Sequence, residues 1–598
     1  MERKEVIIND IVKASQRNDC FTTELTADKW EVVNYKTKFI SGTGILASLR
    51  CFPENIEINP ELKGWYKIYL GIVSDDAYNA INIKLAGDEF SQMVRPGNID
   101  PYINWNHFEV IEESFYKASD MTDKTITLGK PDIDMTYSAS LMWIRFVPMS
   151  DEEVKIHLDD ITNPKYKNIY AHMDTDFTWL DKEDYSNVHN YCKNLYNMKD
   201  SHVKVVAQEV FLDINEESPS YKEPIPYAHR RPRGENVYAH VRLERWKSQI
   251  KNADAIIKEQ VNYAHKYNME FFIAHRMSLG NGVIPFAADL NRVKYYDEHP
   301  EFSCMSRDGK RLSFMSFAYD EIQDFVVEKF NKFAKNGIDG ITLIFTRGLF
   351  VAFEQPVIDL FKERYGDEED IRTLPYSDPR VGEIKSEFMT RFIRKLRNSL
   401  DKISEELNRN RIKIYITAYC SMDDFKNEGI SVEALAKEKL IDGVVQSNMT
   451  VWEDIEGCID ENGKIDLAKY EKKAEDEFII KRAAGNELER NLAGLVDYNR
   501  IAEEYGIKIY SEIQWENSVQ PPKYKEAAEN LLRVIKGNVA LWDCYPHRVS
   551  RLCEWHVTSK LSSLERIEKI NPDEFRTVYK VLNYEEEDMR YHNPNWVG

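Results

Sequence analysis

The sequence predicts a (β/α)8 barrel preceded by an antiparallel β-sandwich, with the end of the chain returning to the sandwich. Three observations support this fold class. The first part is rich in turns and short β-type runs, the middle alternates β-type runs with helical patterns, and the last residues are extended in character again. With 598 residues, the chain is longer than one compact domain usually is. The predicted boundaries are 1–160 for the sandwich, 161–560 for the barrel and 561–598 for the returning extension.

The first 150 residues contain short apolar runs separated by turn residues. The clearest runs are GILASLRCF, GWYKIYLGIV, NAINIKLAG and SASLMWIRFVPM, with clusters of Pro, Gly, Asn and Asp between them. Short alternating strands with such connections are typical of a jelly-roll-like sandwich. The SGTG segment at 41–44 is interpreted as a turn within this region.

From residue 161 onward the sequence alternates between β-type and helical patterns. Helical patterns such as ADAIIKEQVNYAHKYN and EIQDFVVEKFNKFAKNG separate eight β-type runs. Eight strands, each followed by a helix or long loop, predict a closed barrel. No GxGxxG motif follows a strand, which argues against a dinucleotide-binding sheet. The eight runs are KNIYAHMDT, VKVVAQEVF, MEFFIAHRM, GITLIFTR, RIKIYITAYC, IDGVVQSN, IKIYSEIQW and NVALWDCYP.

Composition excludes several classes of function. A formal charge of −21 disfavours nucleic acids and anionic membranes as partners, because both would repel the protein. The eight cysteines show no CxxC spacing, which suits reduced thiols in a cytoplasm better than disulfides or a zinc site. No apolar run resembles a signal peptide or a membrane span. We therefore expect a cytoplasmic protein without cofactor or metal, and a homo-oligomer is possible.

Polar residues near the ends of the eight predicted strands are the candidate site residues. Active sites of (β/α)8 barrels lie at the C-terminal ends of the strands. Carboxylates and amides bind hydroxyl groups and aromatic rings provide flat apolar platforms, so this set predicts a carbohydrate-binding pocket. The candidates are Asp174, Asp176, Glu209, His275, Arg276, Arg347, Tyr419, Gln446, Glu512, Trp515 and Asp543.

Glu512 is the strongest individual candidate. In IKIYSEIQW, Tyr510 and Glu512 alternate with Ile509 and Ile513. The isoleucines must meet the surrounding helices, which turns Glu512 toward the mouth of the barrel. A carboxylate there can act as a nucleophile or as a general acid or base. The alternative is a structural carboxylate that pairs with an arginine.

The other charged candidates have two interpretations each. Asp174 and Asp176 can be catalytic, can bind hydroxyls, or can cap the following helix. Together with His172 they could also bind a metal, although no HExxH motif supports this. Arg276 and Arg347 can recognise an anionic group or can balance the carboxylates around them. Asp543 can bind a hydroxyl or pair with an arginine.

Several motifs resemble those of a known family. HPEF at 299–302, DEIQDFVVEKF, GIDGITLIFTRG, FKERYGDEED and DPRVGEIKSEFMTRFIRKLR follow one another in this order. The sequence is similar, most clearly over 166–420, to glycosyl hydrolase-like family 10, the DUF187 group, whose barrels are described as glycosidases. Many members carry an aspartate in the fourth strand, and Ile344 stands at that position here. The chain looks closer to a subgroup with the pattern RGxxFxxxExPVxxxFxxxYG, here 347–366, and a flanking β-domain.

The resemblance implies a glycoside hydrolase that acts on a small oligosaccharide or glycoside. Retaining sugar hydrolases of the large barrel clan take their two carboxylates from strands four and seven. By this analogy Glu354, on the loop after strand four, is the predicted catalytic partner of Glu512. Asp176 and Asp543 bind hydroxyls, or replace Glu354 if it points away. The alternatives are a carbohydrate-binding barrel without hydrolytic activity and a metal-dependent sugar lyase or isomerase.

Overall fold

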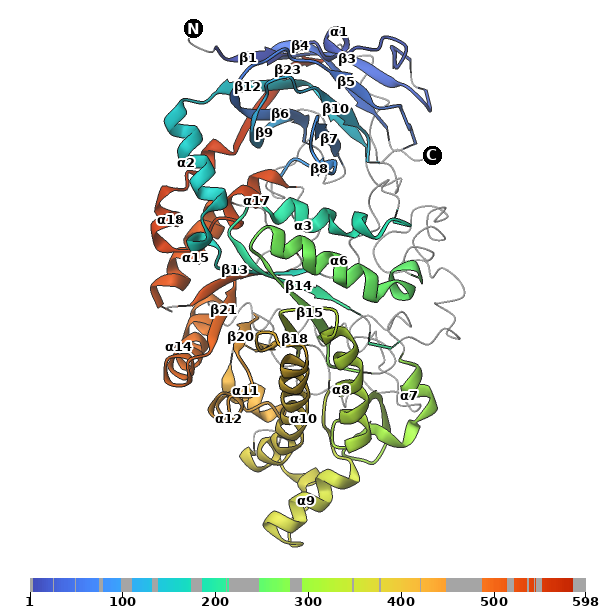
Figure 1. Cartoon of the computed structure of the whole chain (residues 1–598), viewed down its shortest axis with the longest axis vertical. Helices are drawn as coiled ribbons and strands as arrows, with labels where there is room; N and C mark the ends of the chain where they lie inside the picture. The colour runs from blue at the N-terminus through green and yellow to red at the C-terminus, as the bar shows by residue number, and fades with distance from the viewer. Residues whose placement is uncertain are drawn as a thin grey trace.

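The computed structural model shows a β-sandwich at one end of the molecule and a barrel at the other (Figure 1). The structure describes residues between 4 and 584, with gaps. These residues are 4–24, 26–48, 50–74, 79–97, 110–131, 138–173, 185–210, 212–213, 247–279, 293–346, 349–375, 378–419, 421–447, 487–513, 521–534, 537–542, 544 and 551–584.

The sandwich consists of a nine-stranded and a four-stranded antiparallel sheet around one apolar core. The order of the larger sheet is β1-β12-β6-β9-β23-β3-β4-β11, with β2 paired to β3, and that of the smaller sheet is β5-β10-β7-β8. Side chains from both sheets, such as Ile58, Ile68 and Ile83, form the core between them. The strands are β1 (Val6–Ile8), β2 (Phe21–Thr22), β3 (Trp30–Thr37), β4 (Ser41–Ala47), β5 (Ile56–Ile58), β6 (Trp65–Val73), β7 (Ile81–Leu85), β8 (Gln92–Val94), β9 (Val110–Asp120), β10 (Ile126–Gly129), β11 (Ala139–Leu141), β12 (Trp143–Pro148) and β23 (Arg576–Tyr584).

The segment at 41–44 is part of a strand, so its interpretation as a turn was wrong. Thr43 of β4 pairs with Asn34 of β3. Gly42 is needed there for space, because a Cβ atom on it would lie 1.8 Å from the carbonyl oxygen of Asn9. A glycine in a strand can therefore mark a close approach of another backbone segment as well as a turn.

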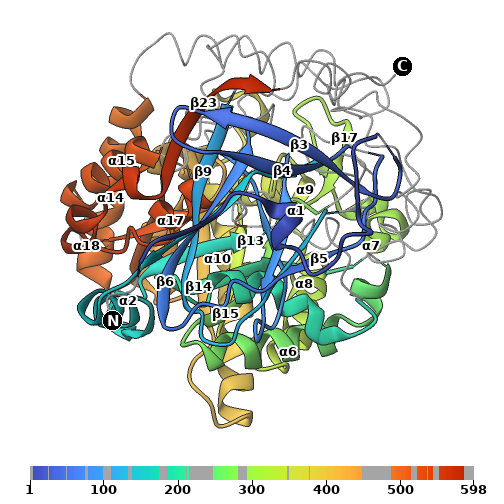
Figure 2. The same ribbon diagram turned by 90° about the horizontal axis from the view of Figure 1, so that it is seen from above.

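The predicted return of the chain to the sandwich is confirmed by β23. Residues 576–580 pair with β9, and residues 581–584 pair with β3, both in antiparallel orientation. Figure 2 shows β23 beside these two strands. At the start of β23, the Arg576 Nε atom lies 2.9 Å from Oε2 of Glu112, whose side chain is fully buried.

The eight predicted barrel strands are confirmed, and they form a closed parallel barrel in chain order. They are β13 (Ile169–Met173), β14 (Val203–Glu209), β15 (Glu270–Arg276), β18 (Gly340–Ile344), β19 (Lys413–Ala418), β20 (Gly443–Gln446), β21 (Lys508–Glu512) and β22 (Asn538–Leu541). After β15 the chain makes an additional hairpin, β16 (Ser303–Met305) with β17 (Arg311–Met315).

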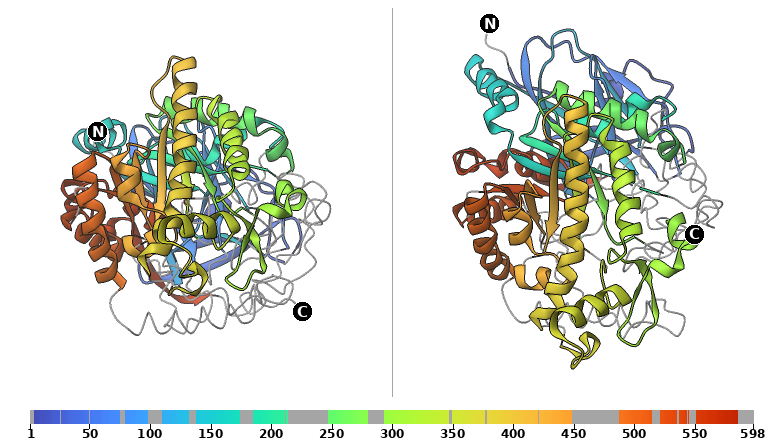
Figure 3. Two further views of the ribbon diagram at one scale, coloured as in Figure 1. Left: turned by 90° about the horizontal axis from the view of Figure 1, so that it is seen from below. Right: turned by 60° about the horizontal axis from the view of Figure 1, so that its bottom comes forward.

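Helices surround the barrel, and Figure 3 shows α8 and the long α10 next to each other on its outside. α10 begins at an Asp378 cap, whose side chain accepts a hydrogen bond from the backbone of Arg380. No helix among the described residues is long and apolar enough to cross a membrane. The helices are α1 (Ile11–Ala14), α2 (Asp151–Thr162), α3 (Lys193–Met198), α6 (Ala253–Lys266), α7 (Lys294–Glu298), α8 (Asp320–Ala334), α9 (Gln355–Tyr365), α10 (Pro379–Glu406), α11 (Met422–Asn427), α12 (Val432–Lys437), α14 (Glu487–Tyr505), α15 (Pro521–Val534), α17 (Leu552–Thr558) and α18 (Leu564–Lys569).

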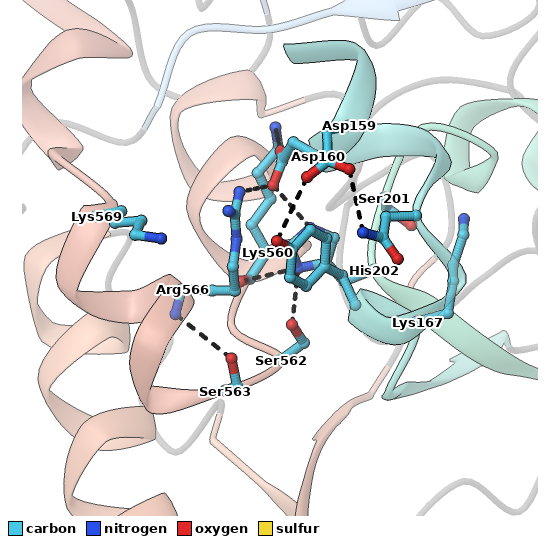
Figure 4. Close-up of polar contacts among 12 residues, drawn as sticks. Asp159, Asp160, Lys167, Ser201, His202, Lys560, Ser562, Ser563, Arg566 and Lys569 are labelled. Atoms are coloured by element: carbon cyan, nitrogen blue, oxygen red, sulfur yellow. Dashed lines mark hydrogen bonds and ion pairs between the residues drawn. The ribbon is translucent and has the colours of Figure 1, made fainter. Parts of the chain in front are cut away.

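A buried polar cluster ties the first helix after the sandwich to the last helices of the barrel (Figure 4). Asp160 of α2 is at its centre. The Asp160 carboxylate is 3.1 Å from Nε2 of His202 and 2.5 Å from Nζ of Lys560, and it also forms an ion pair with Arg566. Ser562 Oγ lies 2.9 Å from Nδ1 of His202. We call these five residues the junction cluster.

Candidate active site

The interior of the barrel is filled by side chains that alternate along the strands. Tyr170, Phe272, Tyr415 and Tyr510 belong to one buried cluster inside the barrel. The Tyr170 ring centroid lies 5.5 Å from that of Tyr510, and the Tyr170 hydroxyl donates to Thr342 Oγ1 at 3.1 Å. These rings fill the centre of the barrel. A ligand site is therefore expected in the next layer of side chains, toward the C-terminal ends of the strands.

Glu512 lies in that outer layer, at the last position of β21. It is two residues beyond Tyr510 and therefore points to the same inner face of the strand. Its carboxylate Oε2 accepts a hydrogen bond from Ser447 Oγ at 3.1 Å, and Ser447 directly follows the neighbouring strand β20. Glu512 is 6% exposed. Ser447 was not among the sequence candidates, because the valines on both faces of β20 give no signal for which of Gln446 and Ser447 points inward.

Glu209 and Arg276 form an ion pair at the ends of β14 and β15. The Arg276 Nε atom lies 2.8 Å from Oε1 of Glu209, and both side chains are about nine-tenths buried. Each residue shares the inner face of its strand with cluster residues, Ala207 for Glu209 and Ala274 for Arg276. A buried guanidinium–carboxylate pair places a fixed positive and a fixed negative group at the mouth.

The pair and Glu512 lie on opposite sides of the barrel. Around the closed barrel, β14 lies half a ring away from β20. In the same way, β15 lies half a ring away from β21, which carries Glu512. Between the two sides, where β13 meets β22, the ring of His172 stacks on Trp542 with centroids 3.9 Å apart and planes 10° apart. The mouth thus has acidic groups on two sides and an aromatic stack on a third.

Two sequence candidates, His275 and Gln446, face the helices instead of the mouth, so their predicted place in the pocket was wrong. His275 Nδ1 contacts the carbonyl oxygen of Val210 at 2.7 Å, and its ring lies against Phe330 of α8. Gln446 Oε1 accepts from Ser511 Oγ at 2.7 Å. Both residues alternate with inward-facing neighbours, which turns their side chains outward. Burial lowers the pKa of His275 to about 4.

Tyr419 also packs into the core between barrel and helices. Its ring centroid lies 5.3 Å from that of Phe425 in α11, and the side chain is 2% exposed. The Tyr419 carbonyl oxygen accepts a hydrogen bond from the hydroxyl of Tyr498 at 2.9 Å. These contacts fit a packing role better than the predicted contact with substrate.

Glu354 precedes α9 and is completely buried. Its carboxylate accepts hydrogen bonds of 3.1 Å from the backbone N–H groups of Met305, in the β16–β17 hairpin, and of Ala352. Burial raises the pKa of the Glu354 carboxyl, while these backbone hydrogen bonds oppose the rise. The carboxylate therefore fastens its loop to the hairpin. Its pairing with Glu512 stays a prediction.

The remaining candidates, Asp174, Asp176, Arg347, Trp515 and Asp543, lie outside the described residues. The alternative metal cluster of His172 with Asp174 and Asp176 therefore also lies partly outside the described residues. Among the residues that the structure describes, one group of three potential metal ligands occurs. It lies between the segment before α3 and helix α6, not among the mouth residues above.

No known family profile and no curated protein sequence matches this chain, so the family resemblance stays a hypothesis. Similar solved structures include the glycoside hydrolase domain of PgaB (BpsB) from Bordetella bronchiseptica, with 12% identity, a TM-score of 0.40, and coverage of 67% of this chain and 99% of that one. The catalytic domain of β-amylase from Paenibacillus polymyxa shows 10% identity, a TM-score of 0.37, and coverage of 66% and 99%. An α-amylase from Lactobacillus plantarum shows 12% identity, a TM-score of 0.31, and coverage of 64% and 72%. These values are too low to transfer an activity or the role of any residue.

Proposed function

We propose that this protein is a glycoside hydrolase whose active site lies at the C-terminal mouth of the barrel, with Glu512 as one of its two catalytic carboxylates. The observation that supports the proposal best is the position of Glu512, inward-facing at the end of β21 and held by Ser447 at 3.1 Å. Chemistry in barrels of this class takes place at that end of the strands. A small oligosaccharide or glycoside is the proposed substrate.

Glycoside hydrolysis needs two carboxyl groups that flank the scissile bond. They stand about 5 Å apart when configuration is retained and roughly 6.5–9.5 Å apart when it is inverted. The contacts of Glu354 are those of a loop anchor. We therefore assign the second carboxyl to Asp176 or Asp543, which follow β13 and β22 in the sequence. Of these two strands, β22 pairs directly with β21, which carries Glu512.

The other mouth residues bind and orient the sugar in this proposal. Glu209 accepts hydrogen bonds from hydroxyl groups while Arg276 keeps its carboxylate in place. The stacked His172 and Trp542 provide an apolar wall. A second candidate function is a sugar-binding barrel without hydrolysis. It is favoured by Ile344 inside the barrel, at the position where the resemblance to glycosyl hydrolase-like family 10 implies an aspartate, and by the anchored Glu354.

The decisive experiment compares Glu512→Gln with the unaltered protein on a panel of nitrophenyl glycosides and short oligosaccharides, with and without a chelator. The amide is nearly isosteric but cannot act as a nucleophile or a proton donor, so kcat should fall about a thousandfold or more. Sugar affinity, measured by calorimetry, should change little. Glu270→Gln is the matched control, because Glu270 begins β15 at the opposite end of the barrel, where it pairs with Lys413. Its activity should remain within a factor of two or three.

Three results distinguish the candidates. Full activity in Glu512→Gln would remove Glu512 from the mechanism. Sugar binding without turnover in the unaltered protein would favour the binding barrel. Activity that disappears with chelator, returns with a divalent metal, and yields an unsaturated or isomerised sugar instead of a hydrolysis product would favour the lyase or isomerase.

A further inference from the structure

The sandwich loop 88–91 and the first residue of β8, Gln92, contact the outer helices of the barrel. Gln92 Nε2 donates to Oδ1 of Asn197 in α3 at 3.0 Å. The Phe90 ring stacks on His189, with centroids 5.5 Å apart and planes 26° apart. His189 belongs to a short 3-10 helix, Val188–Cys192, that leads into α3. The two parts of the protein therefore meet at His189.

Three side chains of different chemistry converge at this contact. Ligand atoms of His189, Cys192 and Glu259 all lie within 4.8 Å of one another. His189 and Cys192 are three residues apart on the 3-10 helix, a spacing that places their side chains on the same side. Glu259 comes from α6, and its Oε1 lies 2.7 Å from Nδ1 of His189.

The second ring nitrogen of His189 contacts another carboxylate. His189 Nε2 lies 2.6 Å from Oε1 of Glu89, in the sandwich loop. The other oxygen of Glu89 accepts a hydrogen bond from the hydroxyl of Tyr263 in α6, also at 2.6 Å. A metal-binding histidine characteristically donates its remaining N–H to such a carboxylate, which fixes the orientation of the ring.

We propose that His189 Nδ1, Cys192 Sγ and a Glu259 carboxylate oxygen bind a divalent cation of the Zn²⁺ type, with Glu89 orienting the histidine. One nitrogen, one thiolate and one carboxylate are a donor set that zinc accepts, with metal–ligand bonds of about 2.0–2.3 Å. Tetrahedral bonds of that length put the ligand atoms roughly 3.3–3.8 Å apart. Atoms that now lie up to 4.8 Å apart need to approach by roughly 1 Å, whereas Nδ1 of His189 and Oε1 of Glu259, at 2.7 Å, need to separate by about half an ångström. The cation then replaces the hydrogen bond between these two residues.

In the structure both ring nitrogens of His189 face carboxylates, so each carries a proton that it donates. Binding the cation displaces the proton from Nδ1 of His189 and the thiol proton from Cys192. Both protons pass to solvent as the nitrogen–metal and sulfur–metal bonds form, the proton on Nε2 stays with Glu89, and no oxidant or reductant takes part. Water supplies the fourth position, since the His189 and Glu259 side chains are each about one-third exposed. Catalytic zinc sites also use three protein ligands and water, but this site lies among the outer helices, away from Glu512.

The proposed cation has a structural role, because its ligands connect two elements of the barrel and Glu89 links them to a third element. The 3-10 helix and α6 belong to the barrel, whereas Glu89 belongs to the sandwich. A bound cation holds the imidazole ring, and the ring in turn holds the sandwich loop through Glu89 and Phe90. This inference is independent of the proposed hydrolase activity.

The test uses the full chain, stripped with chelator and then titrated with Co²⁺ as a spectroscopic substitute for Zn²⁺. We expect one cation per chain, a thiolate-to-cobalt charge-transfer band in the near ultraviolet, and displacement of that band by Zn²⁺. Cys192→Ser should abolish the charge-transfer band. Glu89→Gln should keep the band and weaken binding about 10–100-fold, since it removes only the support of the ligand.

Controls separate loss of the site from loss of folding. Cys20→Ser is the matched variant, because Cys20 is also buried but lies in the sandwich core. It should leave the band and the stoichiometry unchanged, and far-ultraviolet circular dichroism checks that each variant is folded. If Cys192→Ser does not fold, Glu259→Gln serves as the second variant and should weaken binding strongly. No cobalt binding by the unaltered chain, or a charge-transfer band that persists in Cys192→Ser, would overturn the proposal.

Discussion

Replacing Asp160 by Asn tests how much the junction cluster contributes to stability. The substitution keeps the size of the side chain and removes its negative charge. Asp160 is 6% exposed and pairs with Lys560 and Arg566, whose side chains are 20% and 13% exposed. In the variant, two cations remain largely buried without their counter-charge, and His202 Nε2, 3.1 Å away, loses a charged partner.

The expected loss follows from the burial of these groups. Removing one partner of a buried ion pair costs about 3–5 kcal/mol, because the remaining charge stays desolvated. Lys560 and Arg566 keep partial access to water, which places the expected loss near the lower end, at about 3 kcal/mol. An exposed pair behaves differently. Asp367, whose side chain is 86% exposed and lies 3.8 Å from Lys362, should contribute no more than about 0.5 kcal/mol.

Urea unfolding followed by far-ultraviolet circular dichroism and tryptophan fluorescence measures the difference. Asp160→Asn should lower the midpoint with an unchanged m-value, whereas Asp367→Asn should leave the midpoint unchanged. Adding Lys560→Met to the Asp160→Asn variant should recover part of the loss, since it removes one of the unpaired charges. A loss below about 1 kcal/mol, or no recovery in the double variant, would refute the view that buried charge pairing holds this junction.

Three further outcomes are expected at the barrel mouth and beside it. Arg276→Lys keeps the charge but loses the planar fork that holds Glu209, so kcat/KM should fall about tenfold or more, and unchanged kinetics would leave Arg276 a structural role. Glu354→Gln keeps one oxygen acceptor for the loop, so kcat should stay within about tenfold, and a fall of a thousandfold or more would instead establish Glu354 as a catalytic carboxyl. Burial lowers the pKa of His275 to about 4 in the folded protein, so as the pH falls the imidazole binds a proton in the unfolded chain before it does so in the folded protein. The free energy of unfolding therefore decreases between about pH 6.5 and pH 4. His275→Asn should therefore reduce the difference in unfolding free energy between pH 7 and pH 4.5 by about 2 kcal/mol, and an equal pH dependence in both proteins would contradict this.

The eight strands and the inward direction of Glu512 could be predicted because the sequence marks both. The strands are apolar runs of β-forming residues between helical patterns, and in β21 isoleucines alternate with Tyr510 and Glu512. His275 and Gln446 were placed wrongly because barrel strands are buried on both faces. Valines occupy both sides of β20, so the sequence pattern does not indicate which way Gln446 points.

The contacts of Glu354 could not be predicted from the sequence. They depend on the β16–β17 hairpin, whose Met305 is 49 residues away along the chain. The same applies to the partner of Arg276, since an arginine and a glutamate on adjacent strands pair only when the strand register brings them together. Alternation within a strand can be derived from local sequence, whereas contacts between distant segments require the three-dimensional structure.

The position of β23 has a consequence for the order in which the protein is assembled. In the large sheet, β23 lies between β9 and β3. In the strand order of the described residues, it connects the group β1, β12, β6 and β9 to the group β3, β4, β11 and β2. The ribosome releases this segment after the whole barrel has been synthesised. The sandwich therefore cannot close its sheet co-translationally, and its half-sheets expose unpaired edges until the last strand arrives. A fragment that ends after the first domain should lack a continuous large sheet, and a separately supplied peptide covering residues 575–584 is the natural reagent to complete it.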